Sequence, residues 1–205
     1  MWIRVRCGVG NALRSDFKDV KTGAGCASFY GGKMTSSSPV ILIALGANLP
    51  SRFGLPEQSL REAVSRLVQK EIFTIQSSRV YLTAPVPVSD QPWYHNMVVR
   101  VKTAHAPKEV LACLHEIEEE MGRVRVHKNE ARVIDLDLLA YGDEIFTGAG
   151  DDGFILPHPR MHERAFVMLP LRDVAPEWIH PVTGKNVDEI VAQLGVIDGI
   201  RILGE

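Results

Sequence analysis

The feature that most constrains the fold of this chain is the order of its apolar segments. Four short segments have the continuous or alternating apolar pattern of strands, and they are residues 40–45, 73–82, 94–103 and 133–141. Two longer segments place apolar residues on one helical face, and they are residues 57–70 and 107–121. Pro56 and Pro107 stand at the starts of these helices, because a proline fits the first helical turn.

This order predicts an α+β fold with a ferredoxin-like β-α-β-β-α-β core and a mainly antiparallel sheet. C-terminal helices follow the core, with a short helix expected after Pro159 and another near residues 186–194. Residues 1–38 have neither a helical nor a strand period, and we predict a disordered or non-core N-terminal extension there. The remaining residues, 39–205, have the length of a single domain.

The composition narrows the classes of partner. A net charge of −2 and an apolar content of 45% describe an ordinary globular chain, which predicts neither a nucleic-acid nor a membrane partner. No apolar run approaches the roughly 18 residues of a membrane-spanning helix. The three cysteines form no C-x-x-C pair, which is typical of a reducing compartment and predicts a cytoplasmic protein.

The most informative motif is Ile134-Asp-Leu-Asp-Leu-Leu139. In a strand, Asp135 and Asp137 point to one face while the alternate leucines point to the core. Carboxylates at this spacing, roughly 6.6 Å along the strand, can bracket two Mg²⁺ ions about 3.5–4 Å apart. A half-buried strand that shows two acids to water has the same pattern. The arginines at 123, 125 and 132 just before the strand favour a metal–polyphosphate site over that alternative.

A second basic segment covers residues 156–166. Pro159 is expected to open a helix there, with His158 just outside its N-terminus, where anions bind. Arg160 and Arg164 then lie on one face of that helix. His158 and His162 have the spacing of a transition-metal pair, but no third soft ligand is near them in the sequence. A surface basic helix without a ligand is the plainer alternative.

Tyr94 and Asn96 are two residues apart in a predicted strand and therefore share a face. An aromatic ring beside an amide suits the stacking and edge recognition of a flat heterocycle. The alternative is that Tyr94 packs in the core and Asn96 caps a turn.

Five motifs, taken together, resemble those of the 6-hydroxymethyl-7,8-dihydropterin pyrophosphokinase family over about residues 40–205. They are Ala44-Leu-Gly-Ala-Asn-Leu49, Asp90-Gln-Pro-Trp-Tyr-His-Asn96, Gly122-Arg-Val-Arg125, Arg132-Val-Ile-Asp-Leu-Asp137 and Pro157-His-Pro-Arg-Met-His-Glu-Arg-Ala-Phe166. The resemblance implies a monomeric enzyme of folate biosynthesis that uses ATP and two Mg²⁺ ions. It implies diphosphate transfer from ATP to 6-hydroxymethyl-7,8-dihydropterin, with AMP as the second product.

The resemblance also assigns roles to residues of this chain. The metal ligands it implies are Asp135 and Asp137. The catalytic residues are Arg123, Arg132, Asp135 and Asp137. The ATP-binding residues are Glu118, Arg125, Arg132, Leu138, His158 and Arg164. The pterin-binding residues are Thr83, Val86, Tyr94, Asn96 and Phe166. The loop 127–132 departs from the family pattern, because it is one residue shorter and lacks a tryptophan.

Two rival functions fit parts of this pattern. Another Mg²⁺-dependent nucleotidyl or phosphoryl transferase on a ferredoxin-like core would also use paired acids, but it would favour a broader basic surface than a net charge of −2 indicates. A non-catalytic ferredoxin-like ligand-binding domain has no need for two acids beside a cationic loop.

Overall fold

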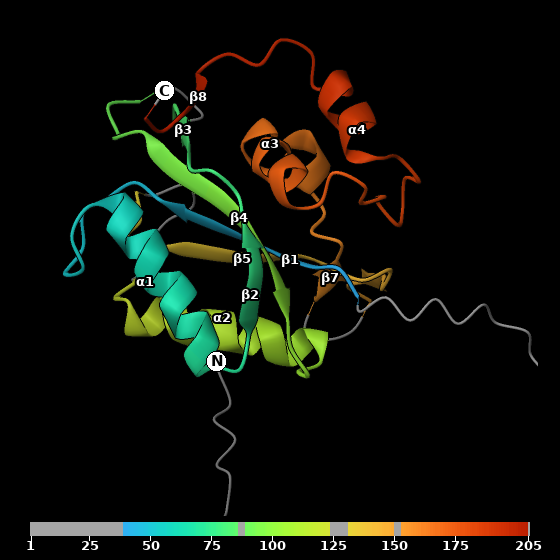
Figure 1. Cartoon of the computed structure of the whole chain (residues 1–205), viewed down its shortest axis with the longest axis horizontal. Coiled ribbons are helices and arrows are strands. Elements are labelled where there is room, and N and C mark those ends of the chain that lie inside the picture. Colours follow the sequence, from blue (N-terminus) through green and yellow to red (C-terminus); the bar gives the residue numbers. More distant parts are fainter. Residues whose placement is uncertain (1–38, 86–88, 124–130, 150–152, 205) are drawn as a thin grey trace, which may run out of the picture. The chain divides into compact units, whose positions relative to one another are not determined.

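The computed structural model describes residues 39–85, 89–123, 131–149 and 153–204. The core elements are β1 (Ile41–Ala47), α1 (Pro56–Gln69), β2 (Phe73–Ser77), β3 (Tyr81–Thr83), β4 (Tyr94–Lys102), α2 (Pro107–Glu120) and β5 (Asp135–Tyr141). The predicted element order is therefore confirmed, with the expected strand 73–82 divided into β2 and β3 (Figure 1). The predicted extension, residues 1–38, lies outside the described residues.

The C-terminal part adds smaller elements to this core. They are β6 (Phe146–Thr147), β7 (Ile155–Leu156), the 3-10 helix η1 (Met161–Glu163), α3 (Ala165–Val174), α4 (Val187–Gln193) and β8 (Ile200–Ile202). The predicted helix near 186–194 is confirmed as α4, whose N-cap Asn186 accepts a hydrogen bond from the backbone N–H of Glu189. Of the helices in the described residues, none combines the length and the hydropathy that crossing a membrane requires.

The main sheet has the strand order β5-β1-β4-β3-β8, and β2 also pairs with β4. Every pairing between these strands is antiparallel, which confirms the predicted fold class. The helices α1 and α2 cover one face of the sheet, whereas α3 and α4 lie on the other face (Figure 1). The sheet therefore carries a hydrophobic core on each side.

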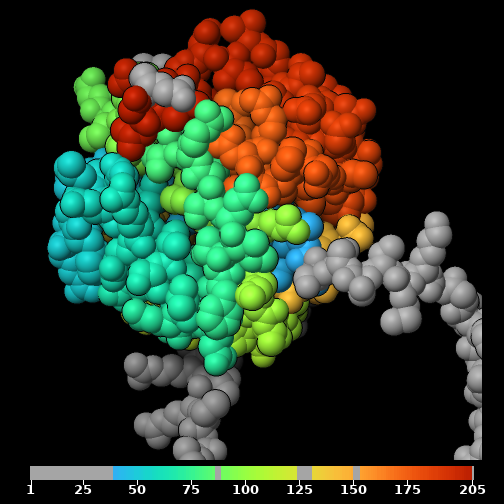
Figure 2. Space-filling view, viewed as in Figure 1, coloured from blue at the N-terminus to red at the C-terminus, as the bar shows by residue number. Residues whose placement is uncertain are grey.

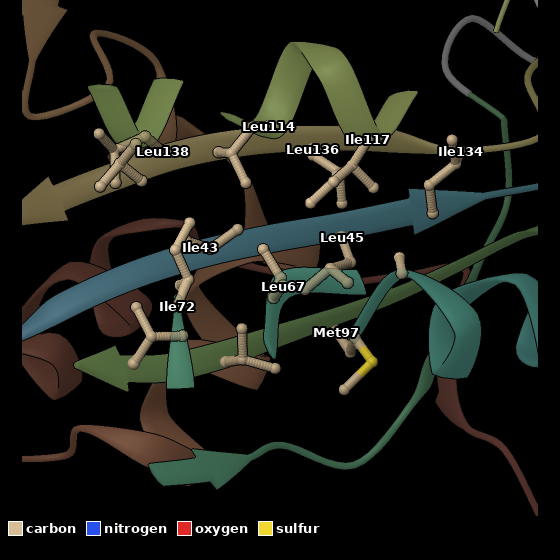
Figure 3. Close-up of a cluster of buried hydrophobic side chains, with 14 of the residues drawn as sticks. Ile43, Leu45, Leu67, Ile72, Met97, Leu114, Ile117, Ile134, Leu136 and Leu138 are labelled. Atoms are coloured by element: carbon tan, nitrogen blue, oxygen red, sulfur yellow. The ribbon is translucent and has the colours of Figure 1, made fainter. Parts of the chain in front are cut away.

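The core between the sheet and α1 and α2 is built from the inward faces of β1 and β5 and the apolar faces of both helices. Ile43 and Leu45 meet Leu114 and Ile117 there, and all four side chains are fully or almost fully buried (Figure 3). The leucines that alternate with the two acids of β5 lie in this core, as the sequence predicts. Their burial directs the intervening carboxylates to the opposite face of the sheet.

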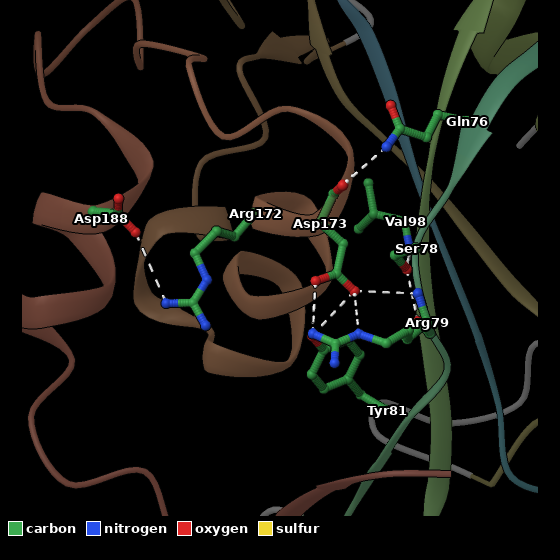
Figure 4. Close-up of polar contacts among 8 residues, drawn as sticks. All are labelled: Gln76, Ser78, Arg79, Tyr81, Val98, Arg172, Asp173 and Asp188. Carbon is green, nitrogen blue, oxygen red and sulfur yellow. Dashed lines mark hydrogen bonds and ion pairs between the residues drawn. The ribbon is translucent and has the colours of Figure 1, made fainter. Parts of the chain in front are cut away.

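A polar network fastens α3 to the sheet (Figure 4). The carboxylate of Asp173 on α3 accepts hydrogen bonds from the Arg79 guanidinium at 2.9 and 3.1 Å and from the Tyr81 hydroxyl at 3.1 and 3.2 Å. The side chain of Gln76 donates to the backbone carbonyl of Asp173 at 3.0 Å. The network therefore holds the C-terminal end of α3 to the sheet.

Replacing Asp173 with Asn is expected to lower the melting temperature by about 3–6 °C. The reason is that the hydroxyl of Tyr81, a residue that is only 4% exposed, loses its charged acceptor. Thermal denaturation followed by circular dichroism measures the change. Asp188→Asn is the matched control, because Asp188 is exposed and contacts Arg172 at 3.8 Å. An equal effect of both variants would contradict the role of the network.

A histidine pair joins η1 to the chain that follows α3. The rings of His162 and His180 meet edge to face with centroids 5.4 Å apart, and His180 is 3% exposed. The Nδ1 atom of His180 accepts hydrogen bonds from the backbone N–H groups of Val182 and Thr183 at 3.2 and 3.3 Å. Burial, and then the neighbouring His162, lower the pKa of His180.

The lowered pKa of His180 has a consequence for acid stability. The unfolded chain binds this proton more readily, so the free energy of unfolding falls as the pH drops below the ordinary histidine value of 6.5. We expect His180→Asn, which keeps an acceptor for the turn, to show a shallower decline of the melting temperature between pH 7 and 5. Parallel pH profiles in wild type and variant would contradict this expectation.

Candidate active site

A cleft of ≈ 780 Å³ opens where β5 and α3 begin and β1 and β3 end. Its walls include most of the predicted site residues, namely Thr83, Tyr94, Asn96, Arg123, Arg132, Asp135, Asp137, His158, Arg164 and Phe166. These residues come from segments that are far apart in the sequence. The structure therefore brings the acidic, basic and aromatic groups together at one cleft.

The floor of the cleft is the backbone of β1 at Gly46. In the strand register Gly46 lies between Asn96 of β4 and Asp135 of β5. A Cβ atom at this position would stand 3.0 Å from the Asn96 side-chain oxygen, a closer approach than most side chains make. The missing side chain therefore leaves a direct path between the amide end and the carboxylate end of the cleft.

Two arginines hold the carboxylate of Asp135. One oxygen lies 2.6 Å from Nη1 of Arg123, and the other lies 2.5 Å from Nη1 of Arg132. The backbone N–H of Arg132 donates to Oδ1 of Asn48 at 2.8 Å, and its carbonyl accepts from the backbone N–H of Asn48 at 3.1 Å. Arg132 is thus anchored at its main chain while its side chain reaches the acid.

Asp137 lies deeper in the protein than Asp135. Burial, followed by the charge of Asp135, raises the pKa of Asp137, and the nearby His158, Arg164 and Arg123 oppose this rise. The pKa of His158 is lowered by burial, which favours its neutral form. Burial disfavours the charged form of the Asp137 carboxylate, and a bound cation would favour that form.

Glu118 acts behind the cleft rather than in its wall. The residue is 2% exposed, and its carboxylate accepts a hydrogen bond from the backbone N–H of Leu136 at 2.7 Å. The same carboxylate pairs with the guanidinium of Arg123. Leu138, which is 4% exposed, packs in the core. Neither Glu118 nor Leu138 borders the cleft, so their contacts with adenosine stay predictions.

Glu118 therefore fixes both the strand segment between the two acids and the side chain of Arg123. We expect Glu118→Gln to lower kcat about 10-fold, because a neutral amide holds Arg123 less strongly than a carboxylate does. Gln still offers an acceptor to Leu136, which limits the loss of stability. Steady-state kinetics measures the effect, with the exposed neighbour Glu119 replaced by Gln as control. An unchanged kcat in Glu118→Gln would contradict this role.

Among the described residues, those predicted to bind the pterin also line the cleft. Thr83 pairs with Tyr94 across β3 and β4, and Asn96 donates from Nδ2 to the Thr83 hydroxyl at 2.7 Å. The hydroxyl of Tyr94 donates to Gln91 at 3.1 Å. Phe166, at the start of α3, lies with its ring centroid 5.7 Å from the Arg164 guanidinium carbon. The shared face predicted for Tyr94 and Asn96 borders the cleft.

The predicted helix opening at Pro159 is wrong. Residues 159 and 160 form a turn, η1 follows, and α3 begins only at Ala165 with Arg164 as its N-cap. The i, i+4 spacing that looked helical thus spans a turn and a 3-10 helix. Arg160 and Arg164 nevertheless both line the cleft.

Two further predicted residues, Arg125 and Val86, lie outside the described residues, as does most of the loop 127–132.

Three residues in or near the cleft, Gly46, Asn48 and His115, were given no role by the sequence; Gly46 and His115 line the cleft, whereas Asn48 does not. Gly46 and Asn48 belong to the motif Ala44–Leu49, which helped to identify the family resemblance but was assigned no role in the site. Asn48 is fully buried. Its side chain donates to Gln91 at 3.3 Å and to the carbonyl of Pro92 at 3.2 Å, so it links the Tyr94 loop to Arg132. His115 of α2 also lines the cleft. The signal in the sequence that could have pointed to Asn48 is an asparagine close after a predicted strand.

Comparison with known proteins agrees with this site. The family model described as 7,8-dihydro-6-hydroxymethylpterin-pyrophosphokinase (HPPK) matches residues 42–176, more than half of the chain. The 2-amino-4-hydroxy-6-hydroxymethyldihydropteridine pyrophosphokinase of Bacillus subtilis is 36% identical over 164 residues, covering 80% of this chain and 89% of that protein. The folic acid synthesis protein fol1 of Pneumocystis carinii is 37% identical over 147 residues, or 72% of this chain, but the match spans 19% of the fol1 length.

A solved structure gives the same fold. The HPPK-DHPS of Plasmodium falciparum with pteroate superposes with a TM-score of 0.60 at 14% identity, covering 81% of this chain and 48% of that chain. At that identity the likeness supports the fold alone, whereas the family model matches residues 42–176, which include Asp135, Asp137 and Phe166. The chain therefore belongs to the 7,8-dihydro-6-hydroxymethylpterin-pyrophosphokinase family.

Proposed function

We propose that this chain transfers the diphosphate of ATP to the hydroxymethyl group of 6-hydroxymethyl-7,8-dihydropterin, giving the pterin diphosphate and AMP in folate biosynthesis. The observation that carries the proposal is the cleft itself, which combines Asp135 and Asp137 with cations at one end and Tyr94, Asn96 and Phe166 at the other. A metal–polyphosphate and a flat acceptor can therefore meet within one cavity.

The residues fit Mg²⁺ as the metal. Within the described residues no cluster of three or more His, Cys, Asp or Glu is present, so the protein offers an oxygen pair rather than a full ligand cage. Mg²⁺ commonly takes one or two carboxylates and completes its shell with phosphate and water. Asp135 and Asp137 would hold two Mg²⁺ ions, which would supply positive charge to stabilise the negative phosphate groups.

The side chains of the chain would then bind and orient the reactants. Arg123, Arg132 and Arg164 line the cleft with the acids and would neutralise the phosphate oxygens that the metals leave free, while His158 in its neutral form would donate a hydrogen bond to phosphate. The acceptor hydroxyl attacks the β-phosphorus in line and AMP leaves, so no covalent enzyme intermediate is needed. Catalysis by this site rests on positioning and charge neutralisation.

The acceptor would lie between the rings of Tyr94 and Phe166. Asn96, which is held by Thr83, would hydrogen-bond to the heterocycle edge.

We further propose that residues 39–205 act as a single domain, as a monomer in the cytoplasm. The remaining predicted ATP contacts, among them Arg125 and Leu138, belong to the same proposal.

Incubation of the full chain with ATP, Mg²⁺ and 6-hydroxymethyl-7,8-dihydropterin tests this function. The expected products are AMP and the pterin diphosphate, separated by anion-exchange chromatography. Release of pyrophosphate or ADP instead of AMP would favour another nucleotidyl or phosphoryl transferase. Binding of ATP at full affinity without Mg²⁺, and without turnover, would favour a ligand-binding domain.

A further inference from the structure

We propose that residues 194–200, which we call the C-terminal strap, form the outer wall of the acceptor end of the cleft, and that Val196 contacts the bound pterin and determines its affinity. The inference rests on the proposed function. It concerns a part of the chain that lies outside the five motifs and beyond residue 176, where the family match ends.

The strap is anchored at both walls of the acceptor end. Its first residue follows α4, which packs against α3, the helix that carries Phe166. Its last residue, Ile200, begins β8 and pairs with Thr83 of β3. The backbone N–H of Ala84 also donates to the carbonyl of Gly199 at 3.0 Å. The strap therefore crosses from the Phe166 wall to the Thr83 wall, and Figure 1 shows this connection running from α4 to β8.

Two glycines set the path of the strap. Gly195 and Gly199 have φ angles of 71° and 69°, which other residues rarely adopt. At Gly199 an added Cβ would lie 3.3 Å from the Cβ of Ala84, so the backbone runs close to the end of β3. The turns at both ends place the three residues between them at the rim of the cleft, where all three line it.

Val196 is the residue of the strap with the most surface to bury. It is 87% exposed, a larger fraction than any other large apolar side chain in the described residues. Scattered exposed apolar side chains are ordinary on protein surfaces. Val196 differs from them because it borders the cleft together with the half-buried Ile197. In Figure 2 the C-terminal part of the chain, in red, lies on the surface along the edge of the orange region and also beside green residues.

A flat heterocycle in the cleft offers the apolar contact that Val196 otherwise lacks. Tyr94 and Phe166 would cover its two faces, Asn96 would bond to one edge, and the strap would close the outer edge. Contact with a valine removes apolar area from water on both partners and so strengthens binding. The contact proposed for Val196 is apolar and involves none of the carboxylates and arginines assigned to the nucleotide, so it should affect the acceptor and leave nucleotide binding unchanged.

Val196→Ser tests the inference without disturbing the core, because the side chain is exposed. The probe is 6-hydroxymethylpterin, titrated by calorimetry into the full chain with Mg²⁺ and a non-hydrolysable ATP analogue. We expect the Kd of the pterin to rise about 5- to 10-fold, while the Kd of the analogue stays within about twofold. Val196→Leu, which keeps an apolar contact, should retain a pterin Kd within about twofold of wild type.

Val182→Ser is the matched control, because Val182 is 61% exposed but does not line the cleft. The inference is supported if only the substitution at 196 weakens pterin binding. It is overturned if wild type binds the pterin and Val196→Ser binds it equally well, an outcome that leaves the proposed function standing. If wild type binds the nucleotide but no pterin, the proposed function fails and the role of the strap fails with it.

Discussion

Asp137→Asn is expected to reduce turnover by about 10³-fold or more while raising the melting temperature of the protein without added metal. The two effects have one cause. Asp137 is a half-buried carboxylate whose pKa is raised by its removal from water and by Asp135, so its charged form costs stability at neutral pH. Asparagine has almost the same shape but no charge. It removes that cost and, with it, the negative charge that a Mg²⁺ ion requires.

Two measurements check this expectation. Turnover is followed by AMP release, and thermal unfolding is recorded with and without Mg²⁺ and an ATP analogue. The ligands should raise the melting temperature of wild type more than that of Asp137→Asn. Asp188→Asn serves as control, since Asp188 lies outside the cleft walls. Near-normal turnover of Asp137→Asn would remove Asp137 from the proposed metal site.

Arg132→Ala is expected to lower kcat by about 10²- to 10³-fold, with a smaller change in the KM for ATP. The guanidinium lies 2.5 Å from Asp135, so it sits beside the position where phosphate charge would develop. The substitution removes this side chain but leaves the backbone hydrogen bonds between residue 132 and Asn48 in place. The loop is therefore expected to keep its path.

Steady-state kinetics with both substrates varied separates kcat from KM. Arg172→Ala is the matched control, because its contact with Asp188 joins α3 to α4 rather than reaching the cleft (Figure 4). A kcat for Arg132→Ala that equals that of the control would exclude Arg132 from transition-state stabilisation.

The core of the fold was predictable from the sequence because its signals are local and strong. Proline at the first turn and an apolar helical face predict α1 and α2 to within a residue or two. The division of the segment 73–82 was not predictable. It depends on Ser78, whose backbone N–H and hydroxyl bond to the main chain of Val98 in place of regular pairing. That contact joins residues far apart in the sequence, and no local pattern records it.

The site residues divide in the same way, into those that local sequence patterns predict and those that depend on contacts between distant segments. The two acids and the cations were predictable because their residue types and spacing report their chemistry. The contact of Glu118 with the nucleotide stays a prediction, and the sequence did not predict that its carboxylate contacts Arg123 and the backbone of Leu136. Asn48, Gly46 and the strap were missed, because their importance comes from register across β1 and from the pairing of β8 with β3. Such long-range pairing becomes visible only in the folded chain.

Because Arg123 and Arg132 both pair with the Asp135 carboxylate, the site should bind a metal ion and a nucleotide together more readily than either of them alone. A lone divalent ion must compete with two guanidinium groups for this carboxylate, and a lone nucleotide must draw the same cations away from it. A nucleotide that arrives with its metal would replace these ion pairs in one event. The metal would take the Asp135 carboxylate and the phosphates would take the two arginines, so each charged group would again have a partner. Joint arrival should therefore be favoured over either ion alone, which would keep the cleft from filling with abundant cellular magnesium before the nucleotide is there.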